Sequence, residues 1–184
     1  MISMKKMLFT LTLAVACAAA FIGCDADDAP APAQPAAGES AASLPANLFL
    51  AKAPDGAVEL AAAKKSAKPG DAIIVRGRIA GQMEPLASNR AILTLLDGSV
   101  KTCEQMPGDS CKTPWDACCE PRESLQANTA TIQIVDADGK PFKTTLRGVN
   151  GIDPLKELVV VGKVKDSGDP NVLVINATGV FVKG

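Results

Sequence analysis

Apolar and polar residues alternate along most of the second half of the chain, which is the pattern of β-strands with one buried face. The alternation predicts strands at residues 71–80, 91–97, 129–135, 157–165 and 171–183. A return strand is expected at 141–147, after the Asp-Ala-Asp-Gly turn signal that ends at Gly139. Residues 57–67 are rich in helix formers and are followed by Pro69-Gly70, so they predict a short helix.

Two of the predicted strands carry a glycine among β-branched and basic residues. Gly77 lies in the first of these strands and Gly162 in the fourth. Strand alternation places Gly77 on one face of its strand and Arg76 and Arg78 on the other. A glycine inside a strand commonly marks a sharp bend or a close approach of two backbones, as at the corner of a small barrel.

The order of these features resembles the OB-fold. The first and fourth strands of that fold often read apolar-x-Gly-basic-apolar, and its second strand ends in Leu-x-Asp, as residues 95–97 do here. The segment at 153–156 stands where the fold has a helix or loop before its fourth strand. The resemblance covers about residues 71–183. It implies an all-β, OB-fold-like small antiparallel barrel with a short helix and a cysteine-rich loop between strands 2 and 3. A small antiparallel sandwich is the alternative for the same pattern.

The N-terminal residues have the three parts of an export signal. Lys5 and Lys6 supply the positive charge, an apolar run follows, and Gly23 precedes Cys24. Residues 21–24 (Phe-Ile-Gly-Cys) resemble the lipobox of bacterial lipoproteins. That resemblance implies a lipid on the Cys24 thiol, cleavage just before it, and a membrane anchor made of acyl chains. An ordinary secretory signal with an incidental cysteine is the alternative.

Export and lipidation divide the chain into three parts. Residues 1–23 are the expected signal peptide, residues 24–45 a lipidated, disordered Ala/Pro linker, and residues 46–184 a single OB-like β domain. The expected location is the cell envelope, on the periplasmic side of the inner or the outer membrane. Asp25 resembles an enterobacterial signal for retention in the inner membrane, a rule that does not hold in all bacteria.

Composition narrows the classes of function. The chain has 19 Lys and Arg against 20 Asp and Glu, and it has no histidine. Ser-His-Asp and Cys-His catalysis and histidine-ligated metals therefore have no residues to use in this chain. The slightly acidic balance argues against nucleic acid as a partner. No spacing of carboxylates marks an acid–base pair, so the sequence assigns no catalytic residue and no cofactor.

The loop before the third strand holds four cysteines: Cys103, Cys111, Cys118 and Cys119. An even number in an exported protein predicts two disulfides. The Cα atoms of Cys118 and Cys119 are ~3.8 Å apart, below the usual disulfide span, so each is expected to pair with Cys103 or Cys111, in either order. A site of four metal-bound thiolates is the alternative. The loop lacks the Cys-x-x-Cys spacing of zinc and iron–sulfur sites, and no metal ligand is assigned.

The same loop carries the only tryptophan, Trp115, followed by Asp116 and, further on, Arg122. These residues are candidates for a ligand-binding surface. Alternatively, Trp115 plugs the end of the barrel and shields the disulfides. Arg76 and Arg78 are candidates for binding an anionic partner, and their alternative is a solvated position on the outside of the strand.

The loop resembles that of small uncharacterised bacterial lipoproteins with Cys…Cys-x-Thr-Pro-Trp-Asp-x-Cys-Cys ahead of an Asn-Thr-Ala-Thr strand, here residues 128–131. That resemblance brings no activity with it. The sequence therefore predicts a non-catalytic, lipid-anchored cell-envelope binding or scaffold module with a disulfide-stapled loop. Its expected partners are the membrane, through the N-terminal lipid, and an envelope protein or glycan. The alternative is a cysteine-based metal-binding or redox protein of the envelope.

Overall fold

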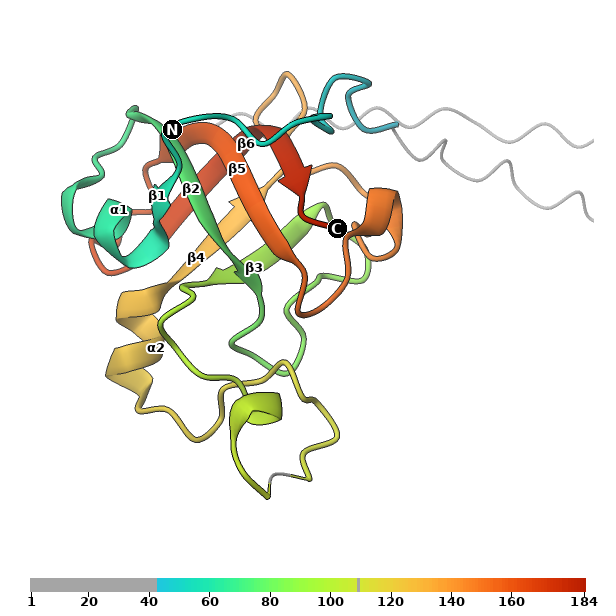
Figure 1. Cartoon of the computed structure of the whole chain (residues 1–184). Coiled ribbons are helices and arrows are strands. Elements are labelled where there is room, and N and C mark those ends of the chain that lie inside the picture. Colours follow the sequence, from blue (N-terminus) through green and yellow to red (C-terminus); the bar gives the residue numbers. More distant parts are fainter. Residues whose placement is uncertain (1–42, 109) are drawn as a thin grey trace, which may run out of the picture. The chain divides into compact units, whose positions relative to one another are not determined.

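The structure, a computed structural model, describes residues 43–108 and 110–184 (Figure 1). The expected signal peptide, most of the expected linker and Cys24, the expected lipidation site, lie outside the described residues. Within the described part of the chain, no helix is long and apolar enough to cross a membrane.

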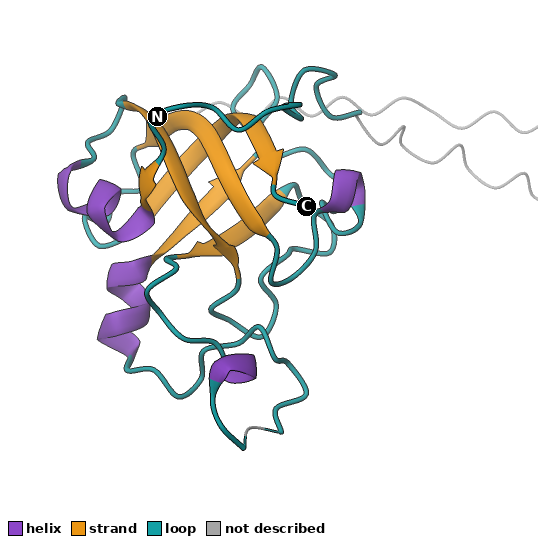
Figure 2. Cartoon of the chain, in the orientation of Figure 1, coloured by secondary structure: helices purple, strands orange, loops and turns teal. Residues whose placement is uncertain are grey.

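Five strands of the described residues close into a barrel (Figure 2). They are β2 (Ala72–Ile79), β3 (Ile92–Leu96), β4 (Thr129–Gln133), β5 (Glu157–Lys165) and β6 (Leu173–Val182). Neighbouring strands follow the order β2-β3-β4-β6-β5, and β5 pairs with β2 to close the sheet. The predicted OB-like all-β barrel is confirmed, and closure excludes a sandwich. The barrel is mixed rather than wholly antiparallel, because β4 and β6 run parallel.

Short elements flank the barrel. β1 (Val58–Glu59) pairs in parallel with β2 and continues into α1 (Leu60–Ser66). α2 (Arg122–Asn128) leads directly into β4. Two 3-10 turns complete the set, η1 (Cys103–Gln105) and η2 (Val149–Gly151). The helix expected at 57–67 is confirmed at residues 60–66, whereas residues 58–59 form β1 and α2 was not predicted.

The return strand expected at 141–147 is wrong. A single bridge joins Val135 and Pro141, and Phe142 still exchanges backbone hydrogen bonds with Ile134 and Ala91, but no strand follows at residues 143–147. Leu146 is fully buried, and the Thr145 hydroxyl donates to the Ala87 carbonyl oxygen 3.0 Å away. These contacts hold the segment against the barrel as a loop.

The two strand glycines lie where neighbouring strands come unusually close. A Cβ atom on Gly77 would stand 2.7 Å from the Leu96 carbonyl oxygen, and one on Gly162 would stand 2.7 Å from Cγ2 of Ile175. Both glycines are buried, while Arg76 on the opposite face of β2 is exposed. The expected close approach is therefore confirmed at both positions, and no larger residue fits there without movement of the neighbouring strand.

Asp97, just after β3, ties the barrel to α1. Its carboxylate accepts hydrogen bonds from the Ala61 backbone N–H at 2.7 Å, the Ser99 hydroxyl at 2.6 Å and the Ser99 backbone N–H at 3.0 Å. Burial alone raises the pKa of this carboxyl group, but the three hydrogen bonds outweigh burial and hold the pKa below its ordinary value. Glu59 makes no side-chain cap at the start of α1, so the N-terminal N–H groups of this helix need other partners. Asp97, from outside the helix, accepts a hydrogen bond from one of them, the Ala61 N–H.

Candidate functional site

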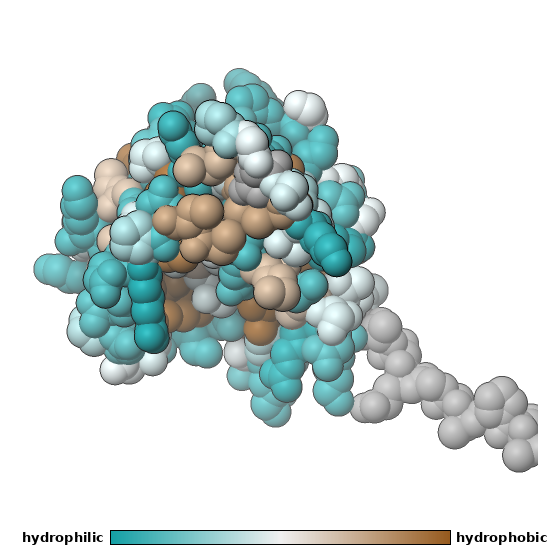
Figure 3. All heavy atoms as spheres, turned by 90° about the horizontal axis from the view of Figure 1, so that it is seen from below, coloured by the Kyte–Doolittle hydropathy of each residue, from teal (hydrophilic) through white to brown (hydrophobic). Residues whose placement is uncertain are grey.

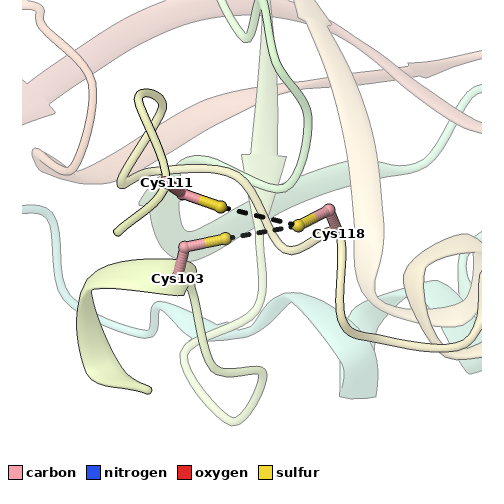
Figure 4. A group of neighbouring side chains, drawn as sticks. All are labelled: Cys103, Cys111 and Cys118. Carbon is pink, nitrogen blue, oxygen red and sulfur yellow. Dashed lines mark hydrogen bonds between the residues drawn. The ribbon is translucent and has the colours of Figure 1, made fainter. Parts of the chain in front are cut away.

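The cysteine loop projects from one end of the barrel and brings three sulfur atoms together (Figures 1 and 4). Sγ of Cys118 lies 3.6 Å from Sγ of Cys103 and 3.9 Å from Sγ of Cys111. All three sulfurs lie within 4.8 Å of one another. Figure 4 shows the side chains of Cys103 and Cys111 pointing toward that of Cys118. We call these three residues the three-sulfur cluster.

The predicted disulfides are not shown by this arrangement. A disulfide holds its two sulfurs about 2.05 Å apart, and the described cysteines have no pair at that distance. Cys119 is exposed and lies outside the three-sulfur cluster. The fold thus groups the cysteines as three and one, where the sequence suggested two pairs.

The first cysteine of the cluster is held by the η1 turn. Thr102 and Gln105 form a capping box around this turn. The Cys103 backbone N–H donates to the Asp116 carbonyl oxygen at 2.8 Å, and the Glu104 N–H donates to that of Pro114 at 3.0 Å. These two bonds connect the parts of the loop that carry Cys103 and Cys118, which explains why residues far apart in the loop meet.

Arg78 fastens the η1 turn to the barrel wall. From β2, its Nη1 donates to Oε1 of Glu104 at 2.7 Å, and its Nη2 donates to Oγ1 of Thr102 at 2.9 Å and to Oε1 of Gln105 at 2.8 Å. The Arg78 side chain is only 17% exposed, and its charge faces the Glu104 carboxylate. Arg78 therefore helps to hold in place the turn that carries Cys103 of the three-sulfur cluster.

Trp115 fastens the other half of the loop. Its indole N–H donates to the Met83 carbonyl oxygen at 2.9 Å, and its own carbonyl oxygen accepts from the Gly81 N–H at 3.0 Å. The half-buried ring packs against a small apolar cluster formed by Ala80, Leu96, Val100 and Ala117. Seen from below, the surface of the protein shows a patch of hydrophobic residues near its middle, surrounded mainly by hydrophilic residues (Figure 3).

The other predicted site residues lie in different settings. Asp116 is half-buried, and its carboxylate accepts from the Ala117 N–H beside it. Arg122 is exposed at the start of α2. Arg76 forms an exposed ion pair with Glu59 at 2.6 Å. Trp115, Asp116 and Arg78 therefore make bonds that hold the cysteine loop in place, while Arg76 has its partner on β1.

A hollow lies elsewhere, between α1 and the loop joining β5 to β6. It has a volume of about 380 Å³, and Lys64, Lys68 and Lys165 are among its lining residues. The Lys64 ammonium donates to the Thr129 carbonyl oxygen at 2.8 Å. Burial lowers the pKa of Lys64, and the charge of Asp169 partly offsets this effect. None of the predicted site residues lines this hollow.

The three-sulfur cluster was not predicted from the sequence, because the spacing of the cysteines was the only available signal. Seven and six residues separate the three cysteines along the chain, and neither interval resembles a chelating motif. The convergence depends on backbone hydrogen bonds between the two arms of the loop. Chemically, three adjacent sulfurs can bind a soft metal ion or exchange with a disulfide.

Comparisons with known proteins add no assignment to this geometry. No protein-family model, no curated protein and no solved structure matches the chain. The function is therefore inferred from the contacts of the described residues.

Proposed function

We propose that this protein is a non-catalytic binding module of the cell envelope whose cysteine loop holds a thiophilic metal ion through Cys103, Cys111 and Cys118. The observation that carries the proposal is the spacing of the sulfurs. With a zinc–sulfur bond of about 2.3 Å, two ligands of a tetrahedral centre stand about 3.8 Å apart, and two ligands of a trigonal centre about 4.0 Å apart. The distances from Sγ of Cys118 to the other two sulfurs are 3.6 and 3.9 Å.

The donor set selects the class of ion. Thiolate sulfur is a soft ligand that favours Zn²⁺ and Cu⁺ over Mg²⁺ or Ca²⁺. Cys103 is buried, whereas Cys111 and Cys118 are exposed, so an ion in the cluster would have protein beneath it and solvent on its outer side. A tetrahedral ion would take its fourth ligand from that side, while a trigonal Cu⁺ ion would need none. The proposal assigns no reaction to the bound ion.

The envelope location comes from the N-terminal sequence. The export signal and the lipobox resemblance support lipidation of Cys24, and the Ala/Pro linker would hold the barrel away from the membrane surface. The membrane is then the partner of the N-terminus. For the barrel itself, we propose an envelope protein or a glycan as the binding partner.

A disulfide-stapled loop is the second candidate, and one observation favours it. Cys103 and Cys118 already lie with their sulfurs 3.6 Å apart, and an exported protein meets oxidising conditions. A disulfide closing this 15-residue separation would stabilise the fold by about 3 kcal/mol. The two candidates make opposite predictions for bound metal and for thiols.

Native mass spectrometry and elemental analysis of the full chain separate the candidates. The protein is purified without chelator or reductant, and its cysteines are then mapped by alkylation and peptide analysis. We expect one zinc or copper ion per chain, with the three cluster cysteines reduced after the metal is removed. Cys103→Ser, Cys111→Ser and Cys118→Ser should each lower metal occupancy, while Cys119→Ser, the matched control in the same loop, should retain it. A metal-free chain with disulfides between cluster cysteines would refute the metal site and support the stapled loop.

A further inference from the structure

The three sulfurs of the cluster differ in exposure, and this difference suggests a second activity. We propose that the metal-loaded cluster reacts with an external disulfide, that Cys118 is the attacking residue and Cys103 the resolving residue, and that the reaction releases the ion. This inference rests on the proposed metal site. The substrate class is a disulfide of a small thiol or of a partner protein.

Exposure and contact together assign the first role. Cys103 is only 2% exposed, so an incoming disulfide cannot reach it from solution. Cys118 is exposed, and its sulfur contacts the sulfurs of both Cys103 and Cys111. When Cys118 attacks the external disulfide, the mixed disulfide that forms lies next to a second cysteine sulfur. This proximity is the condition for rapid resolution of the mixed disulfide.

Its distance from Cys118 and its hydrogen-bonded backbone assign Cys103 as the resolving residue. Sγ of Cys103 lies 3.6 Å from Sγ of Cys118, slightly closer than Sγ of Cys111 at 3.9 Å. A disulfide between Cys103 and Cys118 needs the sulfurs to approach by about 1.5 Å. Cys103 is held in the η1 turn by the capping box, whereas Cys118 lies in an exposed turn, so we expect Cys118 to make most of this movement.

The reaction balances in two exchange steps. The Cys118 thiolate attacks one sulfur of the external disulfide, whose S–S bond breaks as a mixed disulfide forms and the first thiolate leaves. The Cys103 thiolate then attacks the Cys118 sulfur, the mixed disulfide breaks, and the second thiolate leaves. The two cysteines lose two electrons, and the external disulfide gains them. The ion loses two of its three protein ligands and dissociates, because Cys111 alone cannot hold it.

The inference makes the site a redox-sensitive metal carrier. Under reducing conditions the three thiolates hold the ion, and a disulfide of sufficiently oxidising potential empties the site. Cys119 has no place in this scheme, because its sulfur lies outside the cluster. Since it is also exposed and immediately follows the attacking residue, it provides a sharp internal control.

The test treats the zinc-loaded full chain with glutathione disulfide and follows zinc release with a chromogenic indicator. Non-reducing peptide mapping follows at the same time points. We expect one equivalent of zinc released for each Cys103–Cys118 disulfide formed and for each two equivalents of glutathione produced. Cys119→Ser should behave in the same way.

A trapping variant tests the order of the steps without depending on zinc. In the double variant Cys103→Ser, Cys111→Ser, glutathione should accumulate on Cys118, because both sulfurs that lie near it are missing. Glutathione found mainly on Cys119 would overturn the assignment of the attacking residue. Zinc retained by the unmodified chain after saturating oxidation would overturn the redox inference and leave the metal site standing. A chain that takes up no zinc at all would instead refute the proposed function.

Discussion

Replacing Arg78 by methionine tests whether the barrel wall positions the three-sulfur cluster. The guanidinium makes three hydrogen bonds to the η1 turn, to Thr102, Glu104 and Gln105. Methionine keeps an unbranched apolar stem against the strand but removes every donor. Cys103 follows Thr102 directly, so the loss should free the turn that carries the buried ligand. The barrel itself should remain folded, because Arg78 points away from the core.

The expected magnitude follows from the exposure of the group. Hydrogen bonds to a charged donor contribute about 1.5–3 kcal/mol when buried and less when solvent screens them. The Arg78 side chain is 17% exposed and its partner Glu104 is 34% exposed, so we take about 2 kcal/mol for the whole network. If binding must restore the order that the variant has lost, metal affinity falls by about thirtyfold.

The assay is competition for zinc against a chromogenic chelator, with unfolding in urea measured on the same samples. Arg76→Met is the matched control, because Arg76 lies two residues away on the same face and forms an exposed pair with Glu59. The control should change both zinc affinity and stability only slightly. An Arg78→Met protein with unchanged zinc affinity would refute the view that this arginine positions the site.

Two further predictions concern the fold. Asp97→Asn should lower the free energy of unfolding by about 1.5–3 kcal/mol at neutral pH, since the charged acceptor of three hydrogen bonds is lost. Folding lowers the pKa of Asp97, so its charged carboxylate contributes its full stability above the unfolded pKa of about 3.9. This contribution to stability disappears as pH falls through the lower folded pKa. The variant should therefore lose less stability on acidification than the parent. Gly162→Ala should destabilise the barrel by about 1–3 kcal/mol in urea unfolding, through contact with β6. Gly98→Ala, where the added methyl meets nothing within 4 Å, should leave stability nearly unchanged, and equal effects of the two would contradict the packing argument.

The strands of the barrel could be predicted because a period of two is a local property of the sequence. The strand predicted at 157–165 coincides with β5, and the others differ from the structure by one or two residues at most of their ends. The close packing around Gly77 and Gly162 could also be predicted, because a glycine inside a strand commonly marks a position where another backbone comes close. The parallel pairing of β4 and β6 was not predicted, because it depends on how the whole sheet closes.

Other elements left no such local signal. None of the residues of α2 is buried, so this helix has no apolar face for a periodicity to reveal. Arg78 had the pattern of a solvated strand residue, and its role became visible only with the η1 turn beside it. The cluster of Cys103, Cys111 and Cys118 is likewise a tertiary arrangement, which sequence spacing could not predict.

X-ray absorption at the K-edge of the bound metal tests the proposed site most directly, because it counts the ligands and measures their distances. The zinc-loaded full chain should show a first shell of three sulfurs at about 2.3 Å, with one further ligand if the centre is tetrahedral. Cys119→Ser should give the same spectrum, and Cys118→Ser should lose one sulfur from the shell. A first shell made only of oxygen and nitrogen, or one that Cys118→Ser leaves unchanged, would contradict a metal site built from Cys103, Cys111 and Cys118.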